Sequence, residues 1–303
     1  MFLPQLSAAS AALLMATVAV AQIQNNGSPM PNQNFPDVNI QWDNGKWYAF
    51  ATKTNEPGTV NVPVAVSEDY KTWNIVKNAD GKPFDALPVL PKWTRKDKDH
   101  LRVWDPDVVK LDDGTWVMYV ATGIGSGSKH CLAVATSKTL RGPYKIVPKY
   151  DNEPWICPDK SNGAFGVSGF KNWDVKGDWD LPDSAGTRRQ NCGGKVNGRC
   201  GNSYVDDQWS EGGYGGKRYV LYKIQNADQS HGPQTKTPLT IQEVSGKDGY
   251  TLIGRPTRLM DNKGKADAHS IEGPTIYKTP KGKFVFFFAR GNTALPHYAT
   301  GKF

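Results

Sequence analysis

An internal repeat constrains the fold of this chain more than any other feature of its sequence. Residues 35–52 read FPDVNIQWDNGKWYAFAT, and residues 104–122 read WDPDVVKLDDGTWVMYVAT. Each copy contains Pro-Asp, an extended apolar run, an Asp/Asn-Gly turn and a second strand of aromatic and aliphatic residues. Because glycine supplies the positive φ angle that a tight turn requires, each copy predicts a β-hairpin. A repeated hairpin indicates an architecture assembled from similar small sheets.

A further copy of the hairpin spans residues 270–289, which read SIEGPTIYKTPKGKFVFFFA. In this alignment Glu272 takes the place of Asp37 and Asp107 in the two earlier copies. Helical periodicity is absent after the N-terminal segment, and 31 glycines and 21 prolines separate short apolar runs. This pattern predicts an all-β propeller, in which the first strand of each blade lines a central channel. Asp37, Asp107 and Glu272 are therefore expected to face one pocket.

The remaining blade can be aligned in two ways. Its inner strand is formed by residues 163–170, GAFGVSGF, in the first alignment and by residues 201–207, GNSYVDD, in the second. Residues 216–225 supply the partner strand. We favour the first alignment, because its spacing from Asp107 suits a blade repeat. It leaves a polar, cysteine-bearing insertion at about residues 172–215.

The N-terminus has the pattern of a signal peptide. Residues 1–21 contain an apolar stretch that ends in Ala-Val-Ala, a small-residue cleavage site. The stretch is too short to span a bilayer. An uncleaved anchor is the alternative, because no Lys or Arg precedes the apolar stretch. Residues 22–303 are then expected to form a single secreted, extracellular propeller domain.

Secretion favours disulfide bonds among the four cysteines. Cys192 and Cys200 flank a short segment and are expected to pair, which leaves Cys131 to pair with Cys157. The two other connectivities stay open. The cysteine spacing matches no zinc-binding pattern. Asn26 begins the sequence Asn-Gly-Ser, an acceptor for N-glycosylation.

The formal net charge of +8 comes from Lys and Arg residues spread along the whole chain. Acidic or polar residues interrupt the densest basic segments, KWTRKDKDHLR and TRRQ. A nucleic-acid-binding protein would instead gather its basic residues on one face or element. The charge therefore indicates a solvated basic surface, suited to acidic cell-wall material, and argues against a nucleic-acid partner.

Two carboxyl groups across a pocket are what glycoside hydrolysis requires, one to donate a proton and the other to activate water or attack. Glu272 lies among apolar residues, where desolvation favours the protonated form of an acid. Asp37 lies in the more polar segment QNFPDVN and is expected to stay ionised as the base. In the competing interpretation, Pro-Asp marks the start of a turn and its side chain bonds the backbone. The repetition of the pattern favours the pocket.

These segments together resemble glycoside hydrolase family 43, in particular its secreted fungal members. The resemblance rests on NFPDVNIQWDNGKWYAFAT, VWDPDVVKLDDGTWVMYVAT, TPLTIQEVSGKDGYTLIGRPTRLMD and SIEGPTIYKTPKGKFVFFF. It implies a five-bladed propeller that hydrolyses α-L-arabinofuranosyl or β-D-xylosyl linkages with inversion. Asp37 matches the general base of the family and Glu272 its general acid. Trp104 and Asp107 match a Trp-x-Pro-Asp segment that helps to line the pocket.

Two departures from the family pattern bear on activity. Family members carry an Asp at the head of the third blade that tunes and orients the general acid, whereas the favoured alignment puts Gly166 there. The sequence ends at Phe303 in the third strand of the fourth blade, so a propeller truncated in or after blade four is expected. The alternative to an active enzyme is a catalytically impaired carbohydrate-binding propeller or an inactive fragment.

The expected protein is thus a secreted, monomeric glycosidase that acts on arabinan, arabinoxylan or xylan of plant cell walls. His269, three residues before Glu272, is a further candidate for contact with the substrate. No cofactor is expected. A structural calcium ion is compatible with the family, but nothing in this sequence supports one. Neither a membrane nor a nucleic acid is expected as a partner.

Overall fold

The computed structural model describes the chain in the ranges 34–56, 58–95, 102–125, 129–158, 164–171, 195–196, 199–200, 217–224, 237–262, 270–278, 284–291 and 299–302. Regular structure in these ranges is β-strand, apart from a 3₁₀ turn at Pro148–Tyr150. None of the described segments forms a helix long and apolar enough to cross a membrane. The predicted signal peptide, Asn26 and most of the predicted insertion lie outside the described residues.

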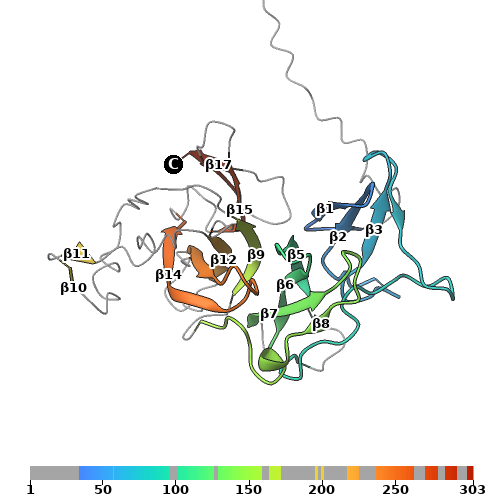
Figure 1. Cartoon of the computed structure of the whole chain (residues 1–303), viewed down its shortest axis with the longest axis horizontal. Coiled ribbons are helices and arrows are strands. Elements are labelled where there is room, and N and C mark those ends of the chain that lie inside the picture. Colours follow the sequence, from blue (N-terminus) through green and yellow to red (C-terminus); the bar gives the residue numbers. More distant parts are fainter. Residues whose placement is uncertain are drawn as a thin grey trace, which may run out of the picture.

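Four antiparallel sheets follow one another along the chain and stand side by side as propeller blades (Figure 1). Their strands are, in chain order, β1 (Asn39–Asp43), β2 (Lys46–Phe50), β3 (Val64–Ser67), β4 (Asn74–Ile75), β5 (Trp104–Lys110), β6 (Trp116–Gly123), β7 (His130–Ser137), β8 (Lys145–Ile146), β9 (Ala164–Lys171), β12 (Arg218–Ile224), β13 (Leu239–Val244), β14 (Leu252–Met260), β15 (Ile271–Lys278), β16 (Phe284–Arg290) and β17 (Ala299–Lys302). The first three blades have four strands each, and the described part of the fourth has three. A separate hairpin of β10 (Lys195–Val196) and β11 (Arg199–Cys200) lies within the predicted insertion.

The pairing in the third blade identifies its inner strand. β9 pairs with β12, and the order across this sheet is β14-β13-β12-β9. The prediction of an inner strand over 163–170 is thereby confirmed to within one residue at each end. The alternative inner strand, 201–207, lies outside the described residues.

The turn between β1 and β2 is the two-residue turn that Asn-Gly predicts. Asp43 pairs with Lys46, which leaves Asn44 and Gly45 as the turn. Their φ angles are 49° and 80°. A two-residue turn with both φ angles positive matches the right-handed twist of the strands that it joins. The turn therefore sets the register of the first blade up to the channel.

Apolar side chains fill the spaces between consecutive blades. Three buried clusters lie in turn between blades 1 and 2, blades 2 and 3, and blades 3 and 4. Each cluster combines side chains from both of its blades, as in Phe50 and Met118, Tyr119 and Val220, and Leu221 and Phe286. Burial of such a side chain stabilises the fold by about 1.5–3 kcal/mol. This packing holds the inner strands β1, β5, β9 and β15 next to one another around the channel.

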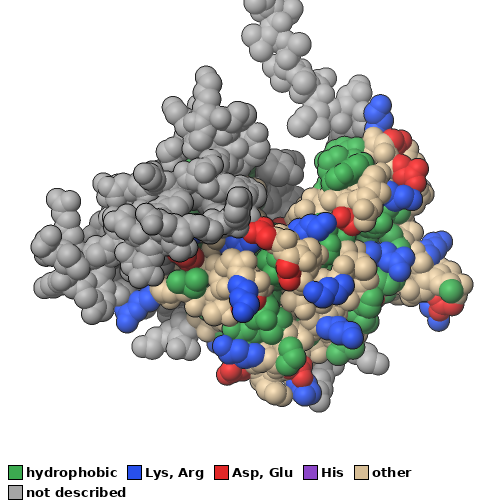
Figure 2. Space-filling view, viewed as in Figure 1, with side chains coloured by type: hydrophobic (Ala, Val, Ile, Leu, Met, Phe, Trp, Pro, Cys, Tyr) green, Lys and Arg blue, Asp and Glu red, His purple; other side chains and the backbone are tan. Residues whose placement is uncertain are grey.

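The surface charge follows the pattern that the sequence predicts. Lys and Arg side chains lie scattered over the described part of the face in Figure 2, with acidic side chains among them. Lys46 pairs with Glu68, and Lys92 with Asp151, each over 2.8 Å. The described part of this face therefore lacks a single basic patch of the kind that binds nucleic acid.

Cys131 and Cys157 form a disulfide bond, as predicted, with their Cα atoms 4.8 Å apart. Cys131 lies in β7, and the segment that carries Cys157 returns to this strand where Leu132 bridges to Ile156. The bond therefore ties the segment after β8 to the second blade. Cys192 lies outside the described residues, so the second predicted bridge stays a prediction.

Candidate active site

Each inner strand carries a β-bulge at the same height in its blade. In blades 1 to 4 the residues that pair with Phe50, Tyr119, Leu221 and Phe287 are Asn39, Asp107, Ser168 and Thr275, respectively. Two residues further along the partner strand, the residues opposite Thr52, Ala121, Lys223 and Ala289 are Pro36, Trp104, Phe165 and Glu272, respectively. The inner strand thus advances three residues while its partner advances two, which defines a bulge. Bulges often lie next to active sites, where they re-aim side chains.

This register corrects the alignment of the carboxylates. Asp107 occupies the position of Asn39, and Asp105 occupies the position of Asp37. Glu272 stands one position before them, opposite Ala289. The alignment that placed Asp37, Asp107 and Glu272 at one position is therefore wrong. That alignment matched the Pro-Asp dipeptides of the copies, whereas the pairing of the strands shows which residues are equivalent.

In blades 1, 2 and 4 the residue two positions before the paired residue has a left-handed backbone. The φ angles there are 54° at Asp37, 51° at Asp105 and 58° at Gly273. Gly166 occupies this position in the third blade. A non-glycine residue with such a φ angle costs on the order of 1–3 kcal/mol, and residues of this kind cluster at functional sites. The bulges of blades 1 and 2 thus each place a strained carboxylate beside the channel.

A hydroxyl links Asp37 to the second blade. Thr52 Oγ1 donates a hydrogen bond to Asp37 Oδ2 over 2.6 Å. The backbone N–H of Asp105 donates to the same Thr52 Oγ1 over 2.9 Å. Thr52 is 6% exposed, so its hydroxyl has little access to water. This chain of hydrogen bonds orients the Asp37 carboxyl group and holds Asp105 next to it in space.

The pKa of Asp37 is raised above its ordinary value. Burial of the carboxyl group is the largest cause, although the residue as a whole is exposed. The hydrogen bond from Thr52 lowers the pKa of Asp37, and the charge of Glu272 raises it. Asp37 is nevertheless exposed as a residue, whereas the side chain of Glu272 is 18% exposed, so the more polar setting of Asp37 stays a prediction.

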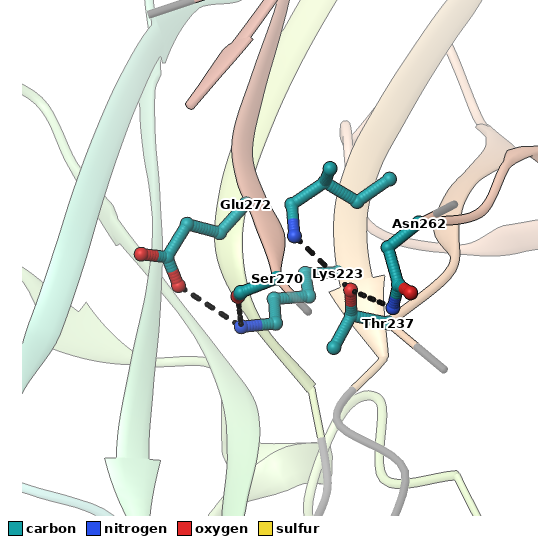
Figure 3. Close-up of polar contacts among 6 residues, drawn as sticks. Lys223, Thr237, Asn262, Ser270 and Glu272 are labelled. Carbon is teal, nitrogen blue, oxygen red and sulfur yellow. Dashed lines mark hydrogen bonds and ion pairs between the residues drawn. The ribbon is translucent and has the colours of Figure 1, made fainter. Parts of the chain in front are cut away.

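Glu272 is held by a buried lysine from the third blade (Figure 3). Lys223 Nζ donates to Glu272 Oε2 over 2.9 Å and to Ser270 Oγ over 3.3 Å. The side chain of Lys223 is 3% exposed and that of Glu272 is 18% exposed. Removal of one partner from a buried pair leaves the other charge uncompensated, at a cost of about 3–5 kcal/mol. The ion pair between Lys223 and Glu272 is therefore expected to persist in the folded protein.

The strand that carries Glu272 is pinned at the preceding residue. The backbone N–H of Ile271 donates to Thr237 Oγ1 over 3.1 Å, and Asn262 Nδ2 donates to the same oxygen over 3.0 Å (Figure 3). Asp261 Oδ1 in turn accepts a hydrogen bond from the backbone N–H of Thr237. These bonds tie the start of β15 to both ends of the β13–β14 hairpin, which fixes the backbone from which Glu272 projects.

Charged groups from all four described blades act on one another in this region. Glu272 influences Asp37 through its charge, and both Glu272 and Asp105 influence Lys223. Blade by blade, the groups are Asp37, Asp105, Lys223 and Glu272. The structure thus brings Asp37 and Glu272 together, as the propeller prediction requires. Two carboxyl groups in such an arrangement can divide proton donation and proton acceptance between them.

Asp107 lies beneath this region rather than within it. The residue is 9% exposed, and its two carboxylate oxygens accept hydrogen bonds from Asn39 Nδ2 over 2.6 Å and from the backbone N–H of Gly169 over 2.7 Å. Burial raises the pKa of Asp107 to about 7, although the hydrogen bonds from Gly169 and Asn39 lower it. Asp107 thus links the inner strands of blades 1, 2 and 3. Contact between Asp107 and substrate stays a prediction, and its surroundings favour a bracing task.

The aromatic candidate, Trp104, is half-buried at the start of β5. Its ring stacks on His130, with ring centroids 4.2 Å apart, and the guanidinium carbon of Arg102 lies 5.7 Å from the ring centroid. Sugar stacking on Trp104 stays a prediction. His269 lies outside the described residues. Among the residues that the structure describes, no group of three or more His, Cys, Asp and Glu side chains is arranged to hold a metal ion.

Three residues of the site were missed in the sequence: Thr52, Asp105 and Lys223. Lys223 carried a usable signal, because it is a charge that directly follows the apolar run 219–222 in the strand RYVLYKI. The same signal singled out Glu272. Asp105 was overlooked because the Pro-Asp dipeptide that follows it matched the repeat. Thr52 was overlooked because threonine is common in strands. A charge within a buried strand requires a partner, which is what Lys223 and Glu272 provide for each other.

No family model matches the chain. Two curated proteins are similar to part of it. One is a β-xylosidase of Formosa agariphila, 29% identical over 120 residues that make up 39% of this chain and 18% of that protein. The other is an extracellular endo-α-(1→5)-L-arabinanase of Thermotoga petrophila, 26% identical over 161 residues, which cover 44% of this chain and 31% of that protein. The chain therefore matches less than a third of the length of either curated relative.

Solved structures match over a larger share of the chain. A thermostable family-43 glycoside hydrolase has a TM-score of 0.56 at 17% identity, covering 88% of this chain and 67% of that one. An endo-arabinase from Bacteroides thetaiotaomicron has a TM-score of 0.52 at 16% identity, covering 89% and 75%. At such identities the likeness concerns the fold. The chain has the five-bladed β-propeller fold of family-43 glycoside hydrolases, of which the described residues form four blades, and its relatives are glycoside hydrolases.

Proposed function

We propose that the protein is a secreted glycoside hydrolase that cleaves arabinose- or xylose-containing plant polysaccharides with inversion of configuration. One observation carries the proposal. Asp37 before β1 and Glu272 in β15, from the first and last described blades, lie close enough for the charge of one to shift the pKa of the other. An inverting glycosidase uses two such carboxyl groups on opposite sides of the scissile bond.

In this mechanism Glu272 acts as general acid and Asp37 as general base. Glu272 gives its proton to the leaving oxygen, while Asp37 takes a proton from the water that attacks the anomeric carbon from the opposite face. The Thr52 hydroxyl orients the Asp37 carboxyl group for this task. The raised pKa of Asp37 makes it a stronger base than an ordinary aspartate, provided that the pH is high enough to ionise it.

The substrate class rests on the relatives. The curated relatives are a β-xylosidase and an endo-α-(1→5)-L-arabinanase, and an endo-arabinase is among the structures with the same fold. The location of the protein rests on the leader pattern of residues 1–21 and on the extracellular arabinanase relative. A basic surface suits approach to the acidic polymers of a plant cell wall.

The test is a screen of the purified protein against an aryl α-L-arabinofuranoside, an aryl β-D-xyloside, arabinan and arabinoxylan. We expect release of arabinose or xylose, with the inverted anomer as the first product in a proton NMR time course. A first product with the anomeric configuration of the substrate would refute inversion. Absence of turnover on all four substrates would refute the enzymatic proposal.

A carbohydrate-binding propeller without catalysis is the second candidate. It is favoured by Gly166, which supplies no carboxylate to the third blade, and by the ion pair of Glu272 with Lys223. An ammonium group favours the ionised form of a carboxyl group, which cannot donate a proton. Calorimetric titration with arabino- and xylo-oligosaccharides distinguishes the two, because this candidate predicts binding with no accompanying hydrolysis.

A further inference from the structure

The buried residue Lys223 occupies, in the third blade, the position that Thr52 occupies in the first. Thr52 is the residue that hydrogen-bonds the carboxyl group of Asp37. Lys223 lies opposite Phe165 beyond the bulge of its blade, as Thr52 lies opposite Pro36 beyond the bulge of the first blade. Thr52 donates its hydrogen bond to Asp37, the bulge residue of its own blade. The corresponding bulge residue in the third blade is Gly166, which has no side chain. Lys223 therefore cannot repeat the contact of Thr52 within its own blade.

Lys223 instead reaches across to the next blade. Its ammonium group lies 2.9 Å from Glu272 Oε2 and 3.3 Å from Ser270 Oγ, and both of these residues stand at the start of the fourth blade (Figure 3). The backbone partners of Lys223 within its own sheet are Phe165 and Leu239, neither of which titrates. The charge of Lys223 is thus directed out of its own sheet, toward the channel.

The charges that face Lys223 come from two other blades. Glu272 faces it from the fourth blade and Asp105 from the second, and the charge of Glu272 also acts on Asp37 in the first blade. Burial lowers the pKa of Lys223, whereas the charge of Glu272, the hydrogen bond to Glu272 and the charge of Asp105 raise it. With its side chain 3% exposed, Lys223 depends on these carboxylates to keep its proton.

We propose that Lys223 is a positioning residue for Glu272: its ammonium group orients the Glu272 carboxyl group, and the charge of the ammonium group sets the pH range in which the site can donate a proton. This inference rests on the proposed function of Glu272 as general acid. The hydrogen bond to Ser270 holds the ammonium group in place, and the hydrogen bond to Glu272 then restricts the rotation of the Glu272 carboxyl group. Such restriction holds a catalytic group in the geometry that its reaction needs.

The consequence is visible in the alkaline limb of the pH profile, where a general acid loses its proton. Because a neighbouring positive charge favours the ionised carboxylate, Lys223 moves this limb toward lower pH. Lys223→Met removes the charge and keeps a side chain of similar length. We expect the alkaline limb of kcat/KM to move up by about 1–3 pH units and kcat to fall at the optimum with a smaller change in KM.

Two variants separate this tuning from a merely structural ion pair. Lys223→Arg retains the charge and is expected to keep the alkaline limb of the parent. Lys217→Met breaks the pair of Lys217 with Glu243, whose atoms are 3.3 Å apart, in the same blade. Lys217 lies six residues before Lys223, which is about 20 Å along a strand, and its replacement is expected to leave the limb unchanged. Circular dichroism verifies that each variant is folded.

The outcomes separate this inference from the proposed function. An unmoved alkaline limb in folded Lys223→Met would overturn the inference, while the loss of activity in Glu272→Gln would still support the function. Infrared titration of the carboxyl groups gives a reading without turnover, with the spectrum of Glu272→Gln subtracted to isolate Glu272. We expect Glu272 to take up its proton at a lower pH in the parent than in Lys223→Met. Equal values would overturn the inference whether or not the parent hydrolyses any substrate.

Discussion

The two carboxyl groups of the site differ in what holds each of them. Asp37 accepts a hydrogen bond from a neutral hydroxyl, that of Thr52, and Glu272 accepts one from the ammonium group of Lys223. A hydroxyl can rotate to accommodate either protonation state, whereas an ammonium group only donates. In the proposed mechanism Asp37 can therefore gain a proton without losing its partner, and the ammonium group of Lys223 stabilises the charge that Glu272 acquires when it gives up its proton.

Substitution of the two carboxyl groups separates their roles. Glu272→Gln is expected to reduce hydrolysis of substrates with poor leaving groups by ~10²–10⁴-fold and to spare activated aryl glycosides, because a good leaving group needs little protonation. Asp37→Asn is expected to disable both substrate types, since the attacking water is activated in each case. Steady-state rates on paired aryl and alkyl glycosides measure the difference. If the parent is active and neither substitution changes its rates, this mechanism is excluded.

Gly166 is the position at which a carboxylate can be added to the third blade. Blades 1 and 2 carry Asp37 and Asp105 in this place in the bulge, so we expect the third blade to accommodate an aspartate there. Gly166→Asp is expected to raise the rate on poor leaving groups, because a further carboxylate beside the channel favours the protonated form of Glu272. The measurement is kcat on arabinan or xylan relative to the parent, with Gly166→Asn as the uncharged control. Equal rates in the Asp and Asn variants would show that charge at this position does not matter.

At the scale of the strands, Asp107 acts as a brace. It lies in β5 and joins Asn39 in β1 to the backbone of Gly169 in β9. The close approach of β9 depends on glycine, because a Cβ atom at residue 169 would lie 2.6 Å from Cε2 of Tyr119. Three inner strands are thereby held at fixed heights, on which the relative placement of Asp37, Asp105 and Lys223 depends.

The brace makes stability depend on pH. The pKa of Asp107 is about 7 in the folded state, above the ordinary value of 3.8, so between these values the folded chain binds one more proton than the unfolded chain. This stabilisation is complete below about pH 4. It is lost as the pH rises toward 7, by at most about 1.4 kcal/mol per pH unit.

Asp107→Asn tests this dependence. The variant is expected to lose about 1–3 kcal/mol, because its amide group faces a hydrogen-bond donor on one side. Its free energy of unfolding should also lack the contribution of Asp107 to the slope between pH 4 and 7. Urea titrations of both proteins across this range measure the difference. Parallel curves for the parent and the variant would show that Asp107 does not titrate in the fold.

At the scale of the whole molecule, the disulfide bond fastens the chain where it leaves the second blade. Cys131 and Cys157 are 26 residues apart, and closure of such a loop stabilises a fold by about 3 kcal/mol. The double variant Cys131→Ala/Cys157→Ala is expected to lose about that much. Non-reducing peptide mapping should recover Cys131 linked to Cys157, and we also expect Cys192 linked to Cys200. Recovery of Cys131 joined to Cys192 would contradict both pairings.

Local patterns in the sequence largely determined the architecture of the fold. The Asn-Gly turn between β1 and β2 and the alternation of turns with apolar runs predict hairpins, because turn chemistry and strand pattern act over a few residues. The repetition of the hairpin then predicts blades, and the four sheets confirm this. The pairing of Cys131 with Cys157 and the inner strand at Ala164–Lys171 were likewise within reach of the sequence.

Only the tertiary structure decided which side chains meet at the channel. The bulge in each inner strand shifts the register by one residue, so Asp105 rather than Asp107 shares the position of Asp37. The pairing of Lys223 with Glu272 joins two blades, and no spacing along the chain encodes it. The physical reason is that local propensity fixes the shape of each hairpin, whereas the contacts between blades depend on how the apolar faces of neighbouring sheets pack.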